Sequence, residues 1–381
     1  MDSKKEMCSK RVERIKGMMS QEGMDALIIF SPINMFYYSG YYPHRPIYPT
    51  DAFRLFPLII PRLGEPFHIV ARNVNKYLKE ESWIEKRFMY DEFMKNAEEF
   101  IAGVLRDEGL SAAKIGVEED VLLLFTTENL KRLLPGISLA YASDILLRAR
   151  DIKDEAEIKL IQRAIDVTIL GMETAFKEIK PGRTEREVAV VCEYEMRKAG
   201  AEWFIEESQV LSGERSKLVR ARTSDNKIKK GDLVLLDMAA VCGKYGSDIS
   251  RTVIVGKATA KQKEFAKMML EVFDATLDFI KPGVKAWEVD QFARKAFGKF
   301  GYGPEHQSHL MGHGFGLDFH ENPIVRPGSK SEFQPGMVFA HEPAVDDPDF
   351  GAMRFEDNVL VTKTGTKVLS SKLPRELIEL S

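Results

Sequence analysis

The sequence Ile179-Lys-Pro-Gly182 is followed by Glu187-Val188, and the same pattern returns 101 residues later as Ile280-Lys-Pro-Gly283 followed by Glu288-Val289. Each copy comes after one predicted long helix and before another. A single match of this kind would be explained by a helix end and the turn that follows it. A second feature in the same register is therefore needed before the pattern indicates a duplicated fold.

That second feature is a glycine, then an apolar run, then a carboxylate six positions after the glycine. Two runs have this form, Gly231 to Asp237 and Gly336 to Glu342. Each half then supplies another carboxylate ahead of a further apolar run, which gives the pair Asp248 and Glu356. Features that recur in register at one period predict a duplicated helix–helix–strand–strand unit.

The region before the repeat has a different pattern of apolar residues. Short apolar runs at residues 25–30, 55–60, 67–71 and 121–125 are predicted strands, and helical stretches such as 94–108 separate them. Strands that alternate with helices indicate an α/β domain. A long helix with one apolar face begins after residue 150. We therefore expect an α/β (α+β) protein with one domain over residues 1–150 and a duplicated domain over residues 151–381.

The composition excludes several classes of protein. The 381 residues include 55 Lys+Arg and 58 Asp+Glu, so the net charge of -3 lacks the basic excess of a nucleic-acid binder. No apolar run reaches the roughly 18 residues of a membrane span, and the first residues do not form a signal peptide. The three cysteines lie far apart without a CxxC pair, which is typical of reduced thiols. We expect a cytoplasmic protein that binds neither nucleic acid nor membrane.

The histidines are unevenly spread along the chain. Five of the seven fall within 36 residues: His306, His309, His313, His320 and His341. This clustering alone suggests a histidine-rich metal site. The carboxylates of the repeat indicate a different ligand set, in which only one of these histidines takes part.

Two facing halves would bring together Asp237, Asp248, Glu342 and Glu356. Buried carboxylates are costly unless they bind a cation, and four that repel one another are better satisfied by two cations than by one. His313 lies between two glycines, which let the backbone approach closely, and it supplies a nitrogen ligand. Oxygen-rich ligands with one imidazole favour Mn(II), with Co(II), Fe(II) and Zn(II) as alternatives. Two such ions make a bridging hydroxide available near neutral pH, which predicts hydrolysis of an amide or similar C–N bond.

The pattern Asp237…Asp248…His313…Glu342…Glu356 resembles the five-ligand site of the pita-bread metallopeptidases, which include methionine aminopeptidase, aminopeptidase P, prolidase and the creatinase-like proteins. The matching segments are residues 236–240, 246–252, 312–317, 319–321, 336–343 and 353–357. Residues 34–40 resemble the signature turn of the creatinase-type N-terminal domain. The resemblance covers nearly the whole chain, and it favours prolidase or aminopeptidase P over methionine aminopeptidase, which lacks that domain.

The resemblance implies a role for each matching residue. The five residues of the pattern would bind two divalent metal ions, and Glu342 would also accept the proton of the bridging water. His320 would contact the substrate carbonyl and stabilise the intermediate. His309 matches a catalytic position in the substrate pocket. Arg354 matches an arginine that orders the site or binds the substrate carboxylate.

One position departs from the family pattern. Arg220 stands where prolidases and aminopeptidases P carry a histidine over the site. Arginine stays charged near pH 7, so it cannot act as a neutral base there, but it is suited to bind an anionic group of a substrate. The metal ligands are untouched, whereas Ala239 replaces a glycine and His341 replaces an aliphatic residue.

The sequence therefore predicts an Xaa-Pro dipeptidase or aminopeptidase, closest to the dipeptidases, that acts on small peptides. The alternative is a creatinase-fold hydrolase or lyase of a small zwitterion or carboxylate. A binding protein on an inactive scaffold is disfavoured, because it would have no reason to keep four mutually repelling carboxylates. The resemblance also implies a homodimer, and the aromatic, Pro-rich residues 41–49 are suited to reach the partner's site.

Overall fold

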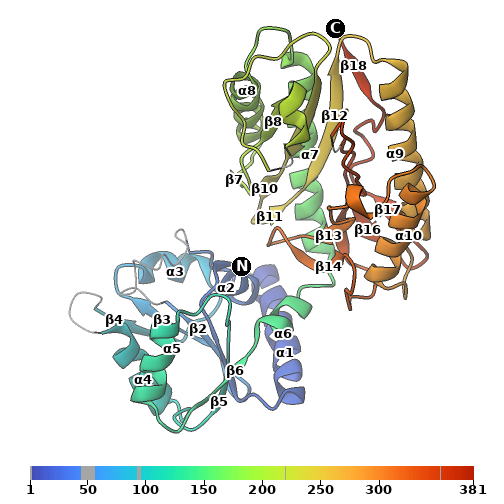
Figure 1. The fold of residues 1–381 in the computed structure, drawn as a ribbon. Helices are drawn as coiled ribbons and strands as arrows, with labels where there is room; N and C mark the ends of the chain where they lie inside the picture. Colours follow the sequence, from blue (N-terminus) through green and yellow to red (C-terminus); the bar gives the residue numbers. More distant parts are fainter. Residues whose placement is uncertain (1, 44–55, 92–95, 219, 352) are drawn as a thin grey trace. The chain divides into compact units, whose positions relative to one another are not determined.

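The computed structural model describes residues 2–43, 56–91, 96–218, 220–351 and 353–381. The chain forms two compact units, Met1–Arg150 and Asp151–Ser381 (Figure 1). Residues 44–49, which carry most of the loop expected to reach a partner subunit, lie outside the described residues. In the described part of the chain, no helix combines the length and the apolar character needed to cross a membrane.

The first unit is an α/β sandwich around one sheet. Its strands are β1 (Ala26–Ile29), β2 (Leu58–Pro61), β3 (Phe67–Ala71), β4 (Arg87–Tyr90), β5 (Lys114–Val117) and β6 (Ser138–Tyr141). Its helices are α1 (Asp2–Gln21), α2 (Pro32–Ser39), α3 (Asn75–Glu81), α4 (Ala97–Asp107), α5 (Leu124–Leu133) and α6 (Ser143–Arg148). Among the described residues, the sheet has the order β4-β3-β2-β1-β5-β6.

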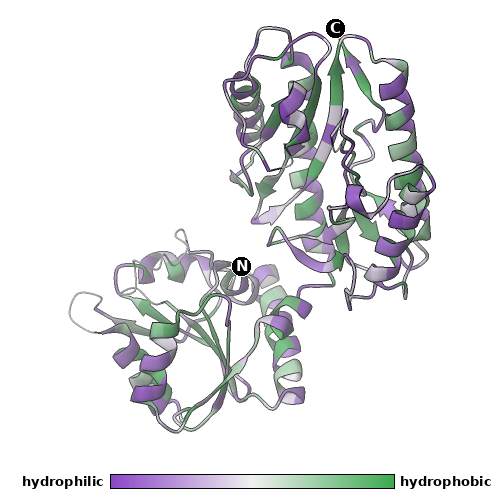
Figure 2. Ribbon diagram, in the orientation of Figure 1, coloured by the Kyte–Doolittle hydropathy of each residue, from purple (hydrophilic) through white to green (hydrophobic). Residues whose placement is uncertain are grey.

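The central strands of this sheet are buried on both faces, which explains why β1 reads as a continuous apolar run. Figure 2 shows the strands mainly in green and the hydrophilic colours mainly on helices and loops. The predicted signature turn at residues 34–40 is α2, a short helix that begins with Ser31 as N-cap and ends at Gly40. Gly40 has φ +78°, a left-handed conformation that a glycine adopts without strain.

The strand predicted at residues 121–125 is wrong. These residues form a turn and the beginning of α5, and the preceding strand is β5 at Lys114–Val117. Leu124 and Phe125 are 76% and 62% exposed, whereas Val121 and Leu122 are partly buried against the core. A run of five apolar residues fits a strand and a helix end equally well, because it is too short to reveal its period.

The second unit contains two helix pairs and several sheets. Its helices are α7 (Glu155–Glu178), α8 (Glu185–Lys198), α9 (Ala260–Phe279) and α10 (Ala286–Gly298). Its strands are β7 (Trp203–Phe204), β8 (Gln209–Ser212), β9 (Leu233–Met238), β10 (Ala240–Cys242), β11 (Tyr245–Gly246), β12 (Ile249–Val255), β13 (Gly312–Gly314), β14 (Glu321–Val325), β15 (Val338–His341), β16 (Asp357–Val361), β17 (Thr366–Val368) and β18 (Ile378–Leu380). Figure 1 shows α8 and α9 on opposite flanks of this unit, with strands between them.

The predicted duplication is confirmed by matching backbone contacts. Gly182 and Gly283 follow the first helix of each pair with φ values of +95° and +89°. The N–H of Gly182 donates to the carbonyl of Ile228 at 2.8 Å, and the N–H of Gly283 donates to the carbonyl of Phe333 at 3.0 Å. Each IKPG turn is therefore held by the segment that leads into the carboxylate-bearing strand of its own half.

The two halves meet where their main sheets adjoin. Among the described residues, strands β8, β9 and β12 of the first half form the sheet β18-β12-β9-β8 together with the C-terminal β18, and the second half forms β14-β13-β15-β16-β17. An antiparallel bridge between Arg251 and Phe355 joins β12 to the residues just before β16. The N–H of Glu356 also donates to the carbonyl of Ser250 at 3.1 Å. This junction brings the strand ends of both halves to one place.

Candidate metal centre

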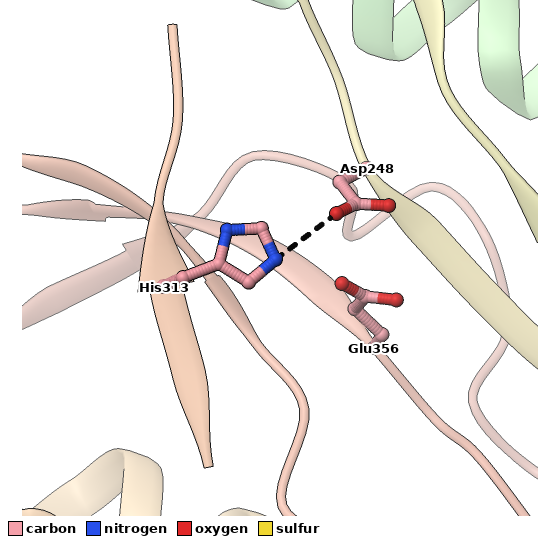
Figure 3. Close-up of side chains that lie close together, drawn as sticks. All are labelled: Asp248, His313 and Glu356. Carbon is pink, nitrogen blue, oxygen red and sulfur yellow. Dashed lines mark ion pairs between the residues drawn. The ribbon is translucent and has the colours of Figure 1, made fainter. Parts of the chain in front are cut away.

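Three of the predicted ligands converge at this junction. Asp248 directly precedes β12, His313 is the middle residue of β13, and Glu356 directly precedes β16. One ligand atom from each of them lies within 4.8 Å of the others, and all three side chains are buried. Figure 3 shows the three side chains pointing toward one another from these separate strands.

The other two predicted ligands flank this trio. Glu342 follows β15, and its Oε1 lies 3.6 Å from His313 Nε2. Asp237 is near the end of β9, and its Oδ2 accepts a hydrogen bond from Arg354 Nη1 at 2.7 Å. All five predicted ligands line the same cavity.

The His313 ring is oriented by its own backbone neighbourhood. Its Nδ1 lies 3.1 Å from the carbonyl oxygen of Gly314, which can only accept, so Nδ1 carries the hydrogen. The lone pair of the neutral ring is then on Nε2, which lies 3.3 Å from Asp248 Oδ2. A lone pair that faces carboxylates in this way is suited to share a metal ion with them. Gly312 allows the strands to approach, because a Cβ at this position would lie 2.5 Å from the carbonyl oxygen of Ala340.

The ionised forms of the carboxyl groups in the centre are disfavoured by burial and by mutual repulsion. Burial raises the pKa of Asp248 and Glu356 well above the ordinary range, and repulsion by Asp237 and Glu342 adds to the effect. Burial also raises the pKa of Glu342, although His313 and Arg354 oppose the shift. Divalent cations would favour the charged forms of these groups. The donor set of four carboxylates and one imidazole therefore fits divalent metal ions that prefer oxygen ligands.

Arg354 forms an ion pair with the carboxylate of the predicted ligand Asp237. Although burial opposes its charge, the carboxylates of the centre raise the pKa of Arg354 above its usual value. Its side chain is 8% exposed, and its Nε and Nη2 have no hydrogen-bond partner among the described residues. Arg354 thus compensates Asp237 while it keeps donors available within the cavity.

The cavity above the centre has a volume of about 810 Å³. His309, His320, Arg220 and Arg354 all line it, together with the predicted ligands. The rings of His320 and His313 have centroids 4.3 Å apart. Partial burial, His313 and Arg220 together lower the pKa of His320 to about 4. Arg220 is exposed to solvent, and no ion pair involves it within the described part of the chain.

Two of the clustered histidines do not line this cavity. His341 is fully buried, and its Nε2 lies 3.1 Å from the carbonyl oxygen of Phe273 on α9. Burial lowers the pKa of His341 to about 4. His306 contacts the carbonyl oxygen of Asp346 through Nδ1 at 2.8 Å. Two of the five clustered histidines therefore lie outside the cavity that the predicted ligands line.

Sequence reasoning missed the residues that hold these groups. Asp346 receives His309 Nε2 at 3.1 Å on one oxygen and the Ser308 hydroxyl on the other. Asn358 accepts the N–H of Asp248 at 3.1 Å. The fully buried Arg251 donates to the carbonyl of Glu356 at 2.6 Å and to the Asp357 carboxylate at 2.7 Å. No local pattern marks such residues, because their partners are distant in sequence.

The chain matches two family models. Residues 159–363 match metallopeptidase family M24, and residues 11–152 match the creatinase/prolidase N-terminal domain. The chain belongs to metallopeptidase family M24. The expected fold class, a creatinase-type α/β domain followed by a pita-bread domain, is confirmed.

Relatives of this M24 protein match along nearly its whole length. It is 35% identical to the Xaa-Pro dipeptidase of Pyrococcus horikoshii, over 98% of this chain and 100% of that protein. The crystal structure of the prolidase from Pyrococcus horikoshii is similar with a TM-score of 0.86 and 33% identity, over 97% of this chain and 100% of that chain. The X-Pro aminopeptidase from Thermotoga maritima is similar with a TM-score of 0.84 and 27% identity, over 96% and 99%. The resemblance to this family, expected from the ligand pattern, is confirmed.

Proposed function

We propose that this protein is a metal-dependent hydrolase of Xaa-Pro dipeptides, and that Asp237, Asp248, His313, Glu342 and Glu356 hold two divalent metal ions, with Mn(II) the best match. The single observation that carries this proposal is the convergence of carboxylates and one imidazole on a cavity of about 810 Å³. The membership of family M24 and the similarity to Xaa-Pro dipeptidases support it. The bound ions would polarise the scissile carbonyl and lower the pKa of a water molecule.

The side chains around the ions would bind and orient the substrate. The Glu342 carboxylate would accept the proton of the attacking water and pass it to the leaving nitrogen. The lowered pKa of His320, about 4, keeps its ring neutral near pH 7, so that one ring N–H can donate to the substrate carbonyl oxygen. His309 also lines the cavity and would contact the substrate, with its ring held by Asp346.

Arg220 and Arg354 would each pair with a carboxylate group. Arg354 pairs with Asp237 through Nη1, and its buried Nε and Nη2 have no hydrogen-bond partner among the described residues. Arg220 is exposed at the cavity wall and is free to pair with the carboxylate of a dipeptide. A dipeptide carries this carboxylate one residue from the scissile bond, whereas a longer peptide does not, so this pairing favours a dipeptidase over an aminopeptidase.

Arg220 also supports the alternative function. A creatinase-fold hydrolase or lyase of a small zwitterion would use the same exposed cation for the carboxylate of its substrate. The two functions differ in the bond that is cleaved, and both use the same metal ligands. Substrate assays therefore separate them, whereas substitutions of the ligands do not.

The test is to load the metal-free protein with Mn(II), Co(II) or Zn(II) and to assay Xaa-Pro dipeptides, Xaa-Pro tripeptides and small zwitterions. We expect turnover of dipeptides, with tripeptides slower and Mn(II) the most effective ion. Turnover of a zwitterion without peptide turnover would support the alternative, and tripeptides faster than dipeptides would indicate an aminopeptidase. The homodimer and the cytoplasmic location stay predictions, and sedimentation at micromolar concentration tests the first.

A further inference from the structure

A buried ion pair lies behind the wall of the cavity. Lys153, just before α7, and Glu321, the first residue of β14, are joined by a contact of 2.8 Å between Nζ and Oε2. Both side chains are 1% exposed, and neither residue lines the cavity. Burial of two charges costs so much desolvation free energy that such a pair stabilises a fold little more than apolar residues would. Its presence therefore points to a requirement for a defined geometry.

Glu321 takes part in hydrogen bonds that connect residues within the segment 316–321. Its Oε1 accepts the N–H of Asp318 at 3.2 Å, and the carbonyl of Asp318 accepts the N–H of Gly316 at 3.0 Å. The carbonyl of Gly316 accepts the N–H of Gly246 from the other half of the unit at 2.8 Å. The segment is thus fixed at both ends, by Lys153 through Glu321 and by Gly246 through Gly316.

Gly316 is the position where this packing leaves no room. A Cβ there would lie 3.0 Å from Glu321 Oε2 and 3.1 Å from Lys153 Cε. Both distances are shorter than an ordinary van der Waals contact, so a side chain would push the ion pair apart. The absence of a side chain at this position is therefore part of the geometry of the pair.

The segment carries Phe319 and His320 to the cavity. The Phe319 and His320 rings have centroids 4.5 Å apart, and the His320 ring lies 4.3 Å from that of His313. The hydrogen bonds among the described residues include none to the His320 ring, and this residue is exposed. The His320 ring is therefore placed by the backbone that carries it and by its contacts with the Phe319 and His313 rings. That backbone is held by Glu321, its immediate neighbour.

We propose that Lys153 and Glu321 are positioning residues, which hold His320 at the metal centre from outside the cavity. This inference rests on the proposed role of His320 toward the substrate carbonyl. A displacement of about 1 Å at such a group costs up to ~100-fold in rate, because the reacting atoms lose their alignment. The ion pair thus acts on the chemical step through the orientation of one imidazole.

The test replaces both charges at once. In the variant Lys153→Met/Glu321→Gln, both members of the ion pair lose their charge together, and the oxygen that accepts the Asp318 N–H is kept. We expect kcat for an Xaa-Pro dipeptide to fall by about 10–100-fold, with KM changed less than about threefold and with metal content unchanged. The matched control is Lys372→Met/Asp166→Asn, which removes an exposed ion pair of 2.9 Å and should leave kcat unchanged.

A double-mutant cycle with His320→Ala identifies the route of the effect. If the pair acts through His320, the double variant should lower kcat in the native background and should add nothing in the His320→Ala background. An equal loss of kcat in both backgrounds would overturn the positioning role. An active His320→Ala variant with native kcat would overturn the proposed role of His320 as well.

A second readout does not depend on activity. With only seven histidines, selective ¹³C labelling of the rings gives few NMR signals, and His320→Ala assigns the one of interest in the metal-free and Zn(II)-loaded protein. We expect a single His320 signal in the native protein and a shifted or broadened one in the double variant. An unchanged signal would contradict the inference even if the protein cleaves no Xaa-Pro bond. Should the double variant fail to fold, Glu321→Asp keeps the charge but shortens the side chain, and it should perturb the same signal and lower kcat. Native values of both in Glu321→Asp would also contradict the inference.

Discussion

The two halves of the duplicated unit share a backbone frame but differ in what their strands present. In the first half, Leu211 on β8 faces Leu235, two residues before Asp237. In the second half, His313 on β13 faces Ala340, two residues before Glu342. A buried leucine thus occupies the position in the first half that the ligand imidazole occupies in the second.

The second carboxylates also differ between the halves. Ser250 on β12 faces Asp237, and Asp248 lies two residues before it. On the other side, His341 faces Asp357, so the same register continued by one residue places Glu356 opposite Glu342. The positional counterpart of Glu356 is therefore Ser250, whose hydroxyl donates to Glu356 itself. The two halves thus share a frame, and differences at single positions within it make the centre asymmetric.

The largest effect on metal binding and activity is expected when the second half is given the leucine that the first half has at the position of the ligand histidine. The variant His313→Leu copies Leu211 and removes the nitrogen ligand. Since loss of a residue that merely supports a metal ligand typically costs 10–100-fold, we expect metal affinity and kcat/KM to fall by more than about 100-fold. Metal analysis and dipeptide assays measure the change. The control Leu211→Met keeps an apolar side chain and should retain the metal; a His313→Leu variant with native metal content would exclude His313 as a ligand.

A second prediction concerns the carboxylates that the two halves contribute. Because the pKa values of Asp248 and Glu356 are raised in the folded, metal-free protein, the folded state holds protons that the unfolded chain releases. The free energy of unfolding of the metal-free protein should therefore fall as the pH rises above about 4, the ordinary pKa of a carboxyl group, through the raised folded-state values. Bound metal should remove this dependence.

Thermal unfolding from pH 5 to pH 8, with and without Mn(II), measures this effect. The variant Glu356→Gln is the control, since it lacks one of the two groups and should show a smaller fall in the midpoint of unfolding. If the metal-free native protein and Glu356→Gln had the same pH dependence, the pKa of Glu356 would not be raised in the folded state.

A smaller effect on substrate binding is expected at Arg220. This residue belongs to the first half and lines the cavity. The variant Arg220→His should raise KM for an Xaa-Pro dipeptide by about tenfold at pH 8, because a neutral ring replaces a permanent charge, and one such charge-assisted contact is worth about 1.4 kcal/mol or more. KM for the corresponding dipeptide amide should change little. Arg222→Ala, a neighbouring cavity residue, is the matched control; equal effects on acid and amide would exclude carboxylate binding by Arg220.

The smallest effect concerns the helix that follows each IKPG turn. Thr184 caps α8 by accepting the N–H of Glu187 at 3.1 Å, whereas Lys285 at the same place before α10 has no acceptor. The variant Lys285→Thr should therefore raise the free energy of unfolding by about 1 kcal/mol, and Thr184→Ala should lower it by a similar amount. Urea titration measures both. Destabilisation by Lys285→Thr would show that the two turns are not equivalent.

The repeat and the ligand pattern were readable from the sequence, because each depends on short spacings within one strand or turn. Asp237 and Glu342 could be placed at strand ends because an apolar run leads directly into each. The strand predicted at residues 121–125 failed for the opposite reason, since five apolar residues carry too little periodicity. His341 belongs to the histidine cluster of the sequence, and one-residue alternation along β15 turns it away from the cavity to Phe273.

The sequence by itself determined the class of fold, the duplication and the identity of the candidate ligands. Only the tertiary structure decided which groups support them: Asp346 behind His309, Arg251 behind Glu356, and Lys153, which meets Glu321 across 168 positions of the chain. The physical reason is that ligand residues are fixed by local strand and turn patterns, whereas their supports are selected by packing between elements. Contacts between elements that are distant in the sequence produce no regular spacing of residues. They can be identified only in the folded structure.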